Sequence, residues 1–355
     1  MGQQEIFVYP SSEGRKPVTP TIGFAAVGLA NGHINSMCDG LIRAGAELKY
    51  VYEPEAALLE PFCKQFAGVQ VCSSVEEVLE KQDIQLIASA DIPSYRADLG
   101  IRAMKAGKDF FVDKAPMTTL EQVEAVRKTC EETGKKYFVY YSESLCDESA
   151  VYARDLIRRG VIGKVLHVDG VAPHRHNPPS RAPWFYTREL TGGILTDIVC
   201  HQIHQFLEFT DAGNARVDMG RASNRCHPQY PGWDDFGDCA CTADNGATGH
   251  FRVDWFTPDG LSSWGDGRML IVGTEGYIEL RKNCNITQGD GGRHVYVVTQ
   301  EGEFHDKVEK KVFIDFYHRV LEDCLNRTET AVAQERAFQA ITLAIEAQNM
   351  ALQNR

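Results

Sequence analysis

The sequence has no long apolar run, since none approaches the roughly 20 residues that a membrane span needs. It has no excess of positive charge either. Its net charge of −12 argues against nucleic acid and against an anionic membrane surface as partners. The first 20 residues lack the basic start, apolar core and small-residue cleavage site of a secretory signal. We therefore expect a cytoplasmic protein, with residues 1–20 as a polar, loosely held arm.

Cysteine pairs at metal-binding or redox spacing are also missing. The eleven cysteines include no C-x-x-C pair, and the closest two are Cys239 and Cys241. In a chain without an export signal, scattered cysteines are expected to be reduced thiols, most of them buried. Neither a disulfide framework nor a cysteine metal site is predicted.

Short apolar runs alternate with helix-like stretches from Thr21 to about Ser142. The runs read TIGFAAV, ELKYVYE, VQVCSS, IQLIASA, DFFVDKA and KKYFVYYS. Alternation at this spacing predicts parallel βαβ units with helices on both faces of the sheet. The predicted fold of residues 21–142 is therefore α/β, a doubly wound parallel sheet of the Rossmann type.

The turn after the first predicted strand reads Gly28-Leu29-Ala30-Asn31-Gly32-His33. A dinucleotide site has G-x-G-x-x-G here, so that the backbone can approach a pyrophosphate at a helix N-terminus. Ala30 replaces the second glycine and Gly32 is an additional one, and a merely structural turn would be the alternative interpretation. The position between a strand and a helix favours a dinucleotide. We expect Gly28, Ala30, Asn31, Gly32 and His33 to line the cofactor site.

Glu53 closes the second predicted strand. A carboxylate at this point accepts hydrogen bonds from the adenosine ribose and repels a 2′-phosphate, which favours NAD over NADP. An ordinary strand-end charge would look the same. Ala90 and Pro93 follow the fourth strand and are expected near the nicotinamide ribose.

The fifth predicted strand delivers a lysine, in the sequence Asp113-Lys114-Ala115-Pro116. The carboxyl ends of parallel strands face the ligand crevice, so Asp113 and Lys114 are expected beside the cofactor. A strand-end lysine is more often a surface charge than a catalyst, and the motif alone leaves its role open.

The stretch from Gly192 to Gln205 reads GGILTDIVCHQIHQ. In helical projection Asp197, His201 and His204 share one face, opposite an apolar one. A core helix with a solvated polar back would show the same stripe. A metal site is the other alternative, but no further ligand cluster accompanies these residues, and no metal is predicted.

The lysine turn and the histidine helix together resemble the motifs E-K-P and G-G-G-x-x-x-D-x-x-x-H of the Gfo/Idh/MocA oxidoreductase family. The resemblance extends from about Thr21 to the C-terminus. It implies that Lys114, Asp197 and His201 converge on one substrate hydroxyl across from NAD. His201 is then the expected base, Asp197 its orienter and Lys114 an electrostatic partner or proton relay. The sequence departs from the family motifs at Asp113, Ala115, Ala30 and His204. Because the three residues expected to act on the substrate are retained, these departures are expected to affect substrate preference and not activity.

Residues 143–330 are predicted to form an α+β substrate domain. Short β-branched and aromatic segments between glycine turns indicate an open, mainly antiparallel sheet, and the resemblance implies homo-oligomer formation through that sheet. Residues 331–355 are expected to form a helix that packs near the first domain. His174, Arg175 and Trp184, in an aromatic loop, are predicted to contact a carbohydrate substrate; His204 is a further candidate, with core or surface placement equally open.

The function favoured by the resemblance is an NAD-dependent dehydrogenase that interconverts a secondary hydroxyl and a ketone on a sugar, a glycoside or a cyclitol. Oxidation at C3 of a glucoside, O-linked or C-linked, is a narrower hypothesis. A glycoside hydrolase or lyase that recycles tightly bound NAD is the alternative from another class. A non-catalytic sugar sensor is disfavoured by the joint presence of Lys114 and His201.

Overall fold

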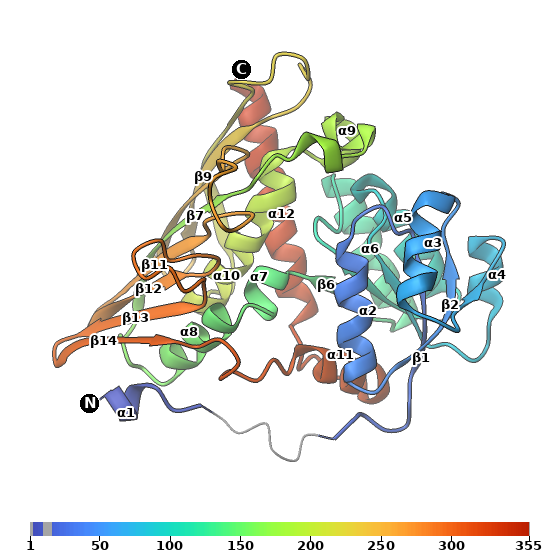
Figure 1. Ribbon diagram of the computed structural model, residues 1–355, viewed down its shortest axis with the longest axis horizontal. Helices are drawn as coiled ribbons and strands as arrows, with labels where there is room; N and C mark the ends of the chain where they lie inside the picture. The colour runs from blue at the N-terminus through green and yellow to red at the C-terminus, as the bar shows by residue number, and fades with distance from the viewer. Residues whose placement is uncertain (1–2, 10–15, 355) are drawn as a thin grey trace. The chain divides into compact units, whose positions relative to one another are not determined.

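The computed structural model describes residues 3–9 and 16–354, which form two compact units. The first unit comprises residues 16–140 and 315–338. The second unit comprises residues 3–9, 141–314 and 339–354. Each unit is built on its own sheet (Figure 1).

The first unit contains a six-stranded parallel sheet in the order β3-β2-β1-β4-β5-β6. Its strands are β1 (Gly23–Val27), β2 (Glu47–Tyr52), β3 (Gln70–Val71), β4 (Leu86–Ser89), β5 (Asp109–Asp113) and β6 (Tyr137–Tyr140). Its helices are α2 (His33–Arg43), α3 (Ala56–Gln65), α4 (Val75–Glu80), α5 (Pro93–Lys105), α6 (Leu120–Thr133) and α11 (Phe316–Asn326). The strand order reverses between β1 and β4, where such sheets bind ligands. The predicted doubly wound fold is confirmed.

The central strands of this sheet are buried along their whole length. Every residue of β1, β4, β5 and β6 is buried, as expected for parallel strands with helices on both faces. Both ends of α6 follow from residues that favour helix ends. Thr119 caps its start by accepting a hydrogen bond from the backbone N–H of Gln122, and Gly134 ends it with φ of 66°.

The second unit contains an eight-stranded sheet in the order β14-β13-β12-β11-β7-β10-β9-β8. Its strands are β7 (Val165–Pro173), β8 (Ala215–Ser223), β9 (Phe236–Ala243), β10 (Thr248–Asp254), β11 (Arg268–Gly273), β12 (Gly276–Arg281), β13 (His294–Thr299) and β14 (Gly302–Lys307). Only β7 and β10 pair in parallel among the described strands of this sheet. The predicted, mainly antiparallel sheet is therefore confirmed.

Helices cover one face of this second sheet (Figure 1). The second unit holds α1 (Gln3–Ile6), α7 (Ser142–Leu145), α8 (Glu148–Arg158), α9 (Arg188–Thr191), α10 (Cys200–Thr210) and most of α12 (Gln334–Gln353). In β9, Cys239 and Cys241 are buried while Asp238 and Ala240 are partly exposed, which is the alternation of a sheet covered on one side. Within the described range no helix lies on the opposite face (Figure 1).

Residues 315–338 belong to the first unit, although the sequence places them mostly in the second domain. The reason is aromatic packing. The ring of Phe316 lies 5.9 Å from that of Phe111, and an added Cβ on Gly40 would lie 2.2 Å from the ring of Tyr317. Gly40 thus lets α11 approach α2 closely, a long-range contact that the local sequence pattern does not show.

Residues 3–9 are held by specific contacts, which differs from the expected loose arm. The hydroxyl of Tyr152 donates to the carbonyl of Ile6 at 2.8 Å, and Arg159 donates to the carbonyl of Glu5 at 2.6 Å. Ile6 is fully buried. Residues 16–20 belong to the first unit, and the rest of the predicted arm lies outside the described residues.

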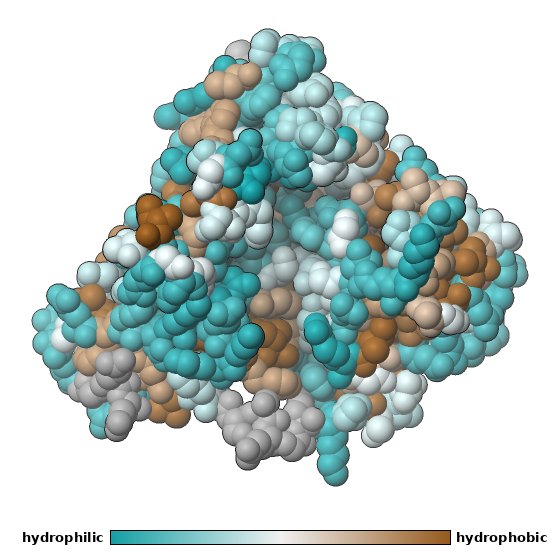
Figure 2. Space-filling model, viewed as in Figure 1, coloured by the Kyte–Doolittle hydropathy of each residue, from teal (hydrophilic) through white to brown (hydrophobic). Residues whose placement is uncertain are grey.

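Hydrophilic residues dominate the face shown in Figure 2, with hydrophobic residues in separate patches. All eleven cysteines lie in the described part of the chain and none forms a disulfide. No helix of the described residues is long and apolar enough to cross a membrane.

Candidate functional site

The turn after β1 requires glycine at its first position. Gly28 has φ of 75°, and an added Cβ would lie 2.5 Å from the Cβ of Asp91. Its N–H donates to the carbonyl of Tyr52 at 3.1 Å, and the N–H of Asn31 donates to the carbonyl of Ala90 at 2.8 Å. The turn is therefore fastened to the ends of β2 and β4, and the predicted residues Gly28, Asn31 and Ala90 lie together.

The helix that follows this turn presents an open N-terminus. Gly32 is the N-cap of α2 with no side-chain hydrogen bond to the cap, and an added Cβ on Gly32 would meet nothing within 4 Å. Asn31 accepts the N–H of His33 at 3.1 Å. The positive end of the helix dipole thus lies beside an open space at Gly32, which a phosphate group can approach.

Glu53 lies beside the same turn and is 9% exposed. One carboxylate oxygen accepts the N–H of Leu29 at 2.7 Å and the other accepts the N–H of Glu55 at 2.9 Å. Each oxygen can accept a second hydrogen bond, which leaves room for a ribose hydroxyl. The turn, the open helix start and this carboxylate fit NAD.

The lysine turn at the end of β5 is built around a buried carboxylate. Asp113 is fully buried and lies 2.9 Å from Nδ1 of His33 and 3.2 Å from a guanidinium nitrogen of Arg96. Burial alone would raise the pKa of Asp113, but His33 and Arg96 outweigh it and lower the pKa to about 2. Lys114 is 7% exposed, and the peptide bond between Lys114 and Ala115 is cis. Arg96 is a residue that the sequence interpretation missed.

Pro93, predicted near the cofactor, is the first residue of α5. That helix begins at the carboxyl end of β4, after Ala90, which is fully buried. Proline is suited to the first helical position because its missing N–H would have no partner inside the helix there.

The histidine helix of the second unit begins with a π-helical turn, Leu195–Val199, and continues as α10. The sequence predicts an ordinary α-helix here. Gly192 and Gly193 have φ of 83° and 90°, and an added Cβ on Gly193 would lie 2.5 Å from the side-chain carbon of Gln348. The glycine pair is therefore required by backbone conformation and by the close approach of α12. Single π-helical turns often mark functional sites.

The two histidines of this helix are both buried. His201 is 2% exposed and its ring lies edge-on to Tyr141 at 6.1 Å. His204 is fully buried, stacks on Tyr141 at 4.7 Å and lies 2.8 Å from the hydroxyl of Ser144. Asp197 is partly exposed and precedes His201 by about one helical turn. The polar face of this helix is therefore largely buried and is not a surface exposed to solvent. The described residues contain no group of three or more potential metal ligands.

Polar residues next to His201 in α10 take part in an ionic network. The side chain of Gln202 donates to Glu143 at 3.0 Å, and the ammonium of Lys282 lies 3.5 Å from the same carboxylate. Lys282 also donates to Gln205 at 2.5 Å and is 2% exposed. These contacts attach Gln202 and Gln205 of α10 to α7 and to the residue that follows β12, which holds the helix that carries His201.

The aromatic loop that is predicted to contact the substrate is held by packing between aromatic side chains. The ring of His174 lies 4.6 Å from that of Trp264, and Trp184 lies 6.3 Å from Phe185. Arg175 donates to several carbonyls between Pro258 and Ser263, so it holds that loop in place. Substrate contacts of His174, Arg175, Trp184 and His204 stay predictions.

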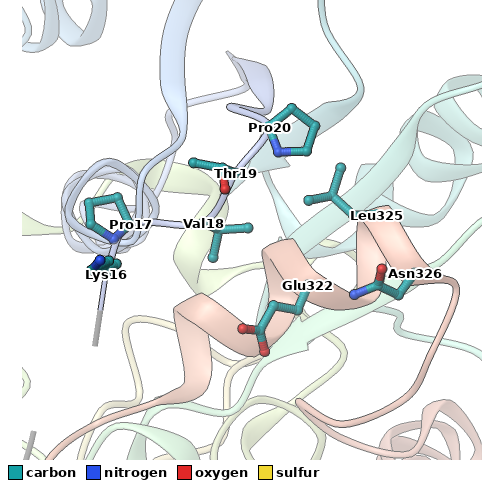
Figure 3. Close-up of a pocket in the computed structure, with 8 residues that line it drawn as sticks. All are labelled: Lys16, Pro17, Val18, Thr19, Pro20, Glu322, Leu325 and Asn326. Carbon is teal, nitrogen blue, oxygen red and sulfur yellow. The ribbon is translucent and has the colours of Figure 1, made fainter. Parts of the chain in front are cut away.

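Each unit contains a pocket, and neither pocket is lined by Lys114, Asp197 or His201. One, of about 690 Å³ in the first unit, separates residues 16–20 from Glu322, Leu325 and Asn326 of α11 (Figure 3). The other, of about 330 Å³ in the second unit, is lined by Trp264, Lys282 and Arg293 among others. Lys114 belongs to the first unit, and Asp197 and His201 to the second, so their expected convergence stays a prediction.

Comparison with known proteins gives matches over most of the chain. Residues 22–141 match the model described as "Oxidoreductase family, NAD-binding Rossmann fold", and residues 150–279 match the GFO/IDH/MocA C-terminal domain. A crystal structure of a protein from Erwinia carotovora atroseptica SCRI1043, designated an oxidoreductase, is 48% identical. It aligns with a TM-score of 0.91 over 93% of this chain and 99% of that chain.

Two further relatives have more specific names. The scyllo-inositol 2-dehydrogenase (NAD(+)) of Bacillus subtilis (strain 168) is 27% identical over 271 residues, 74% of this chain and 75% of that protein. Levoglucosan dehydrogenase, in complex with NADH and levoglucosan, shares the fold at 16% identity, with a TM-score of 0.79 over 94% of this chain and 98% of that chain. The two domain matches and the close structural relative show that the chain belongs to the Gfo/Idh/MocA family of oxidoreductases, with an NAD-binding Rossmann domain.

Proposed function

We propose that the protein is an NAD-dependent dehydrogenase that interconverts a secondary hydroxyl and a ketone on a sugar, a glycoside or a cyclitol. The observation that carries this proposal is the turn after β1. Its glycine geometry, the open space at Gly32 before α2 and the buried carboxylate of Glu53 suit NAD. The similarity to an inositol dehydrogenase supports a polyhydroxylated ring as substrate.

The proposed chemistry assigns one role to each polar residue. His201 takes the hydroxyl proton, because imidazole titrates near neutral pH and can act as a general base. Asp197, about one turn earlier on the helix, orients the imidazole and stabilises its protonated form. Lys114 stabilises charge on the substrate oxygen. NAD, when bound, accepts the hydride from the carbinol carbon.

Substrate recognition is proposed for the aromatic loop of the second unit. Ring faces such as those of Trp184 and Trp264 can stack against the C–H faces of a sugar, and His174 can hydrogen-bond a hydroxyl. Trp264 is 49% exposed, which leaves its face accessible. A glucoside oxidised at C3 is the narrower proposal.

Assembly through the second sheet is also proposed. Met269 and Ile271 of β11 are buried while Leu270 is 36% exposed, and Ile278 of β12 is buried while Tyr277 is 39% exposed. Alternation in strands places Leu270 and Tyr277 on the face opposite the helices. Two large exposed hydrophobic side chains on adjacent strands suit a contact between copies of the chain.

The proposed function is tested by absorbance at 340 nm with NAD and a panel of glucosides, free sugars and inositols. We expect NADH formation with one substrate group, and a loss of about 100-fold or more in Lys114→Ala and His201→Ala. Glu208→Gln, at the far end of α10 where Glu208 pairs with Arg154 at 3.0 Å, is the control and should retain turnover.

Two results would contradict the proposal. One is NADH formation that persists at full rate in both variants. The other is release of an aglycone without net NADH, which would identify the hydrolase or lyase alternative.

A further inference from the structure

We propose that Arg96 is the positioning residue for Lys114. Its guanidinium group is surrounded by the backbone carbonyls of the lysine turn and holds that turn in one conformation. The inference rests on the proposed function, in which Lys114 acts on the substrate. Arg96 lies in α5, well before Lys114 in the sequence, and both belong to the first unit.

One guanidinium nitrogen of Arg96 is within hydrogen-bond distance of three consecutive carbonyls. It lies 3.0 Å from the oxygen of Asp113, 2.5 Å from that of Lys114 and 3.0 Å from that of Ala115. The peptide groups on both sides of the Lys114 α-carbon are therefore fixed by the same cation. Movement of the lysine backbone would break at least one of these bonds.

The other nitrogens of Arg96 complete the attachment. The second terminal nitrogen donates to the carboxylate of Asp113 at 3.2 Å, and the ε nitrogen donates to the carbonyl of Asp91 at 2.6 Å. Arg96 is fully buried, so a lost acceptor would not be replaced by water. A planar fork with five N–H donors can serve acceptors in several directions, which the single ammonium of a lysine cannot reproduce.

The charged and titratable groups around Arg96 are few. Asp91 precedes α5, Asp113 ends β5 and Lys114 follows it. His33 begins α2, and Tyr137 of β6 donates to the carbonyl of Pro116 at 3.1 Å. Asp113 is shared between Arg96 and His33. The carboxylate of Asp113 thus connects Arg96 to His33, the first residue of α2, whose start is the proposed site of the cofactor phosphates.

The contacts of Arg96 concentrate on the turn that carries Lys114. Here three of the five acceptors are backbone carbonyls of Asp113, Lys114 and Ala115. The contacts therefore act on the placement of one side chain.

The test uses Arg96→Lys, which keeps the buried charge but loses the fork. We expect kcat to fall by about 10- to 100-fold because Lys114 is misplaced, while the dissociation constant of NAD changes by less than about threefold. Arg102→Gln is the matched control. Arg102 lies on the same helix but points to Glu76 at the surface, and this variant should behave as wild type.

A second measurement needs no substrate. Amine acylation followed by mass spectrometry reports the accessibility of each lysine in the folded protein. In Arg96→Lys, the labelling rate of Lys114 should rise several-fold. Lys108 is the internal control: it is 5% exposed in the same unit, held by the carbonyl of Ile84 at 3.1 Å, and should not change. If Arg96→Lys does not fold, Asp113→Asn removes one acceptor and should also raise Lys114 labelling selectively.

The outcomes separate the two proposals. Unchanged Lys114 labelling in the folded variants, or an equal rise at Lys108 and Lys114, overturns the inference about Arg96. So does full kcat in Arg96→Lys when Lys114→Ala is inactive. Full activity of Lys114→Ala would instead overturn the catalytic role of Lys114, whatever Arg96 does.

Discussion

At the scale of single residues, Glu53 shows how a side chain can serve both the fold and a ligand. Its two oxygens accept backbone N–H groups from Leu29 and Glu55, so it shapes the turn that would hold the cofactor. The remaining lone pairs can accept a hydrogen bond from the 2′-hydroxyl of NAD, and the negative charge repels the 2′-phosphate of NADP. A strand-end carboxylate with only structural bonds would lack this discrimination.

Glu53→Gln tests the cofactor preference. The amide cannot accept bonds at both positions, so we expect NAD to bind about 10-fold more weakly, as for the loss of a hydrogen bond to a charged group. Affinity for NADP should rise relative to NAD because the repulsion is removed. Calorimetric titration of both cofactors measures this, and an unchanged NAD-to-NADP ratio would contradict it.

The sequence predicts some residues at this site and misses others for a physical reason. Glu53 and Lys114 follow from their places at strand ends, because parallel strands direct their carboxyl ends to one crevice. The role of Arg96 cannot be predicted in this way, because its partners belong to the turn at residues 113–115, which lies beside Arg96 only in the folded protein. One signal is available: Asp113 follows the apolar run Phe110-Phe111-Val112, and a buried carboxylate requires a cation or several N–H donors.

At the scale of elements, the helix that carries His201 combines predicted and unpredicted features. The glycine pair and the buried apolar side of the helix are readable from the sequence. The π-helical turn is not, and its first residue, Leu195, donates its N–H to Gln348 of α12 at 3.0 Å. A contact across 153 residues leaves no trace in local periodicity.

The aromatic loop is an element whose stability should depend on pH. His176 lies 2.9 Å from the hydroxyl of Tyr186 and stacks on Trp233 at 4.8 Å. Burial, then the neighbouring His227 and Arg181, lower the pKa of His176 from 6.5 to about 4. The unfolded chain therefore binds more protons between these values, and acidification favours unfolding.

We expect the free energy of unfolding to fall as the pH drops from about 6.5 towards 4, and to fall less in His176→Gln. Urea denaturation at pH 7 and pH 5 measures the difference. His250→Gln, at a histidine 46% exposed on the second sheet, is the control for general effects of histidine loss. Equal losses of stability in wild type and His176→Gln would argue against this role of His176.

At the scale of the whole molecule, the order of elements along the chain predicts two sheets of different kinds. The alternation of strands and helices before Ser142 and the glycine-separated strands after it are local patterns. The return of α11 to the first unit and the fastening of residues 3–9 are not local. They depend on contacts such as Phe316 with Phe111 and Tyr152 with Ile6.

The exposed hydrophobic side chains of β11 and β12 lead to a prediction about assembly. Light scattering should give a mass that is a multiple of the 39.6 kDa chain, and Leu270→Asp should shift it towards the single chain by placing a charge in the contact. A wild-type protein that stays monomeric at about 50 μM would be incompatible with an oligomer of ordinary stability.

The central claim is that hydride passes from a substrate carbon to NAD. The most direct measurement uses a substrate from the active group with deuterium on its carbinol carbon, in a single turnover with stoichiometric protein. We expect deuterium in the nicotinamide ring of NADH by mass spectrometry, appearing about 100-fold more slowly when His201→Ala replaces the wild type. A nicotinamide ring that stays free of deuterium while the substrate is consumed would contradict it.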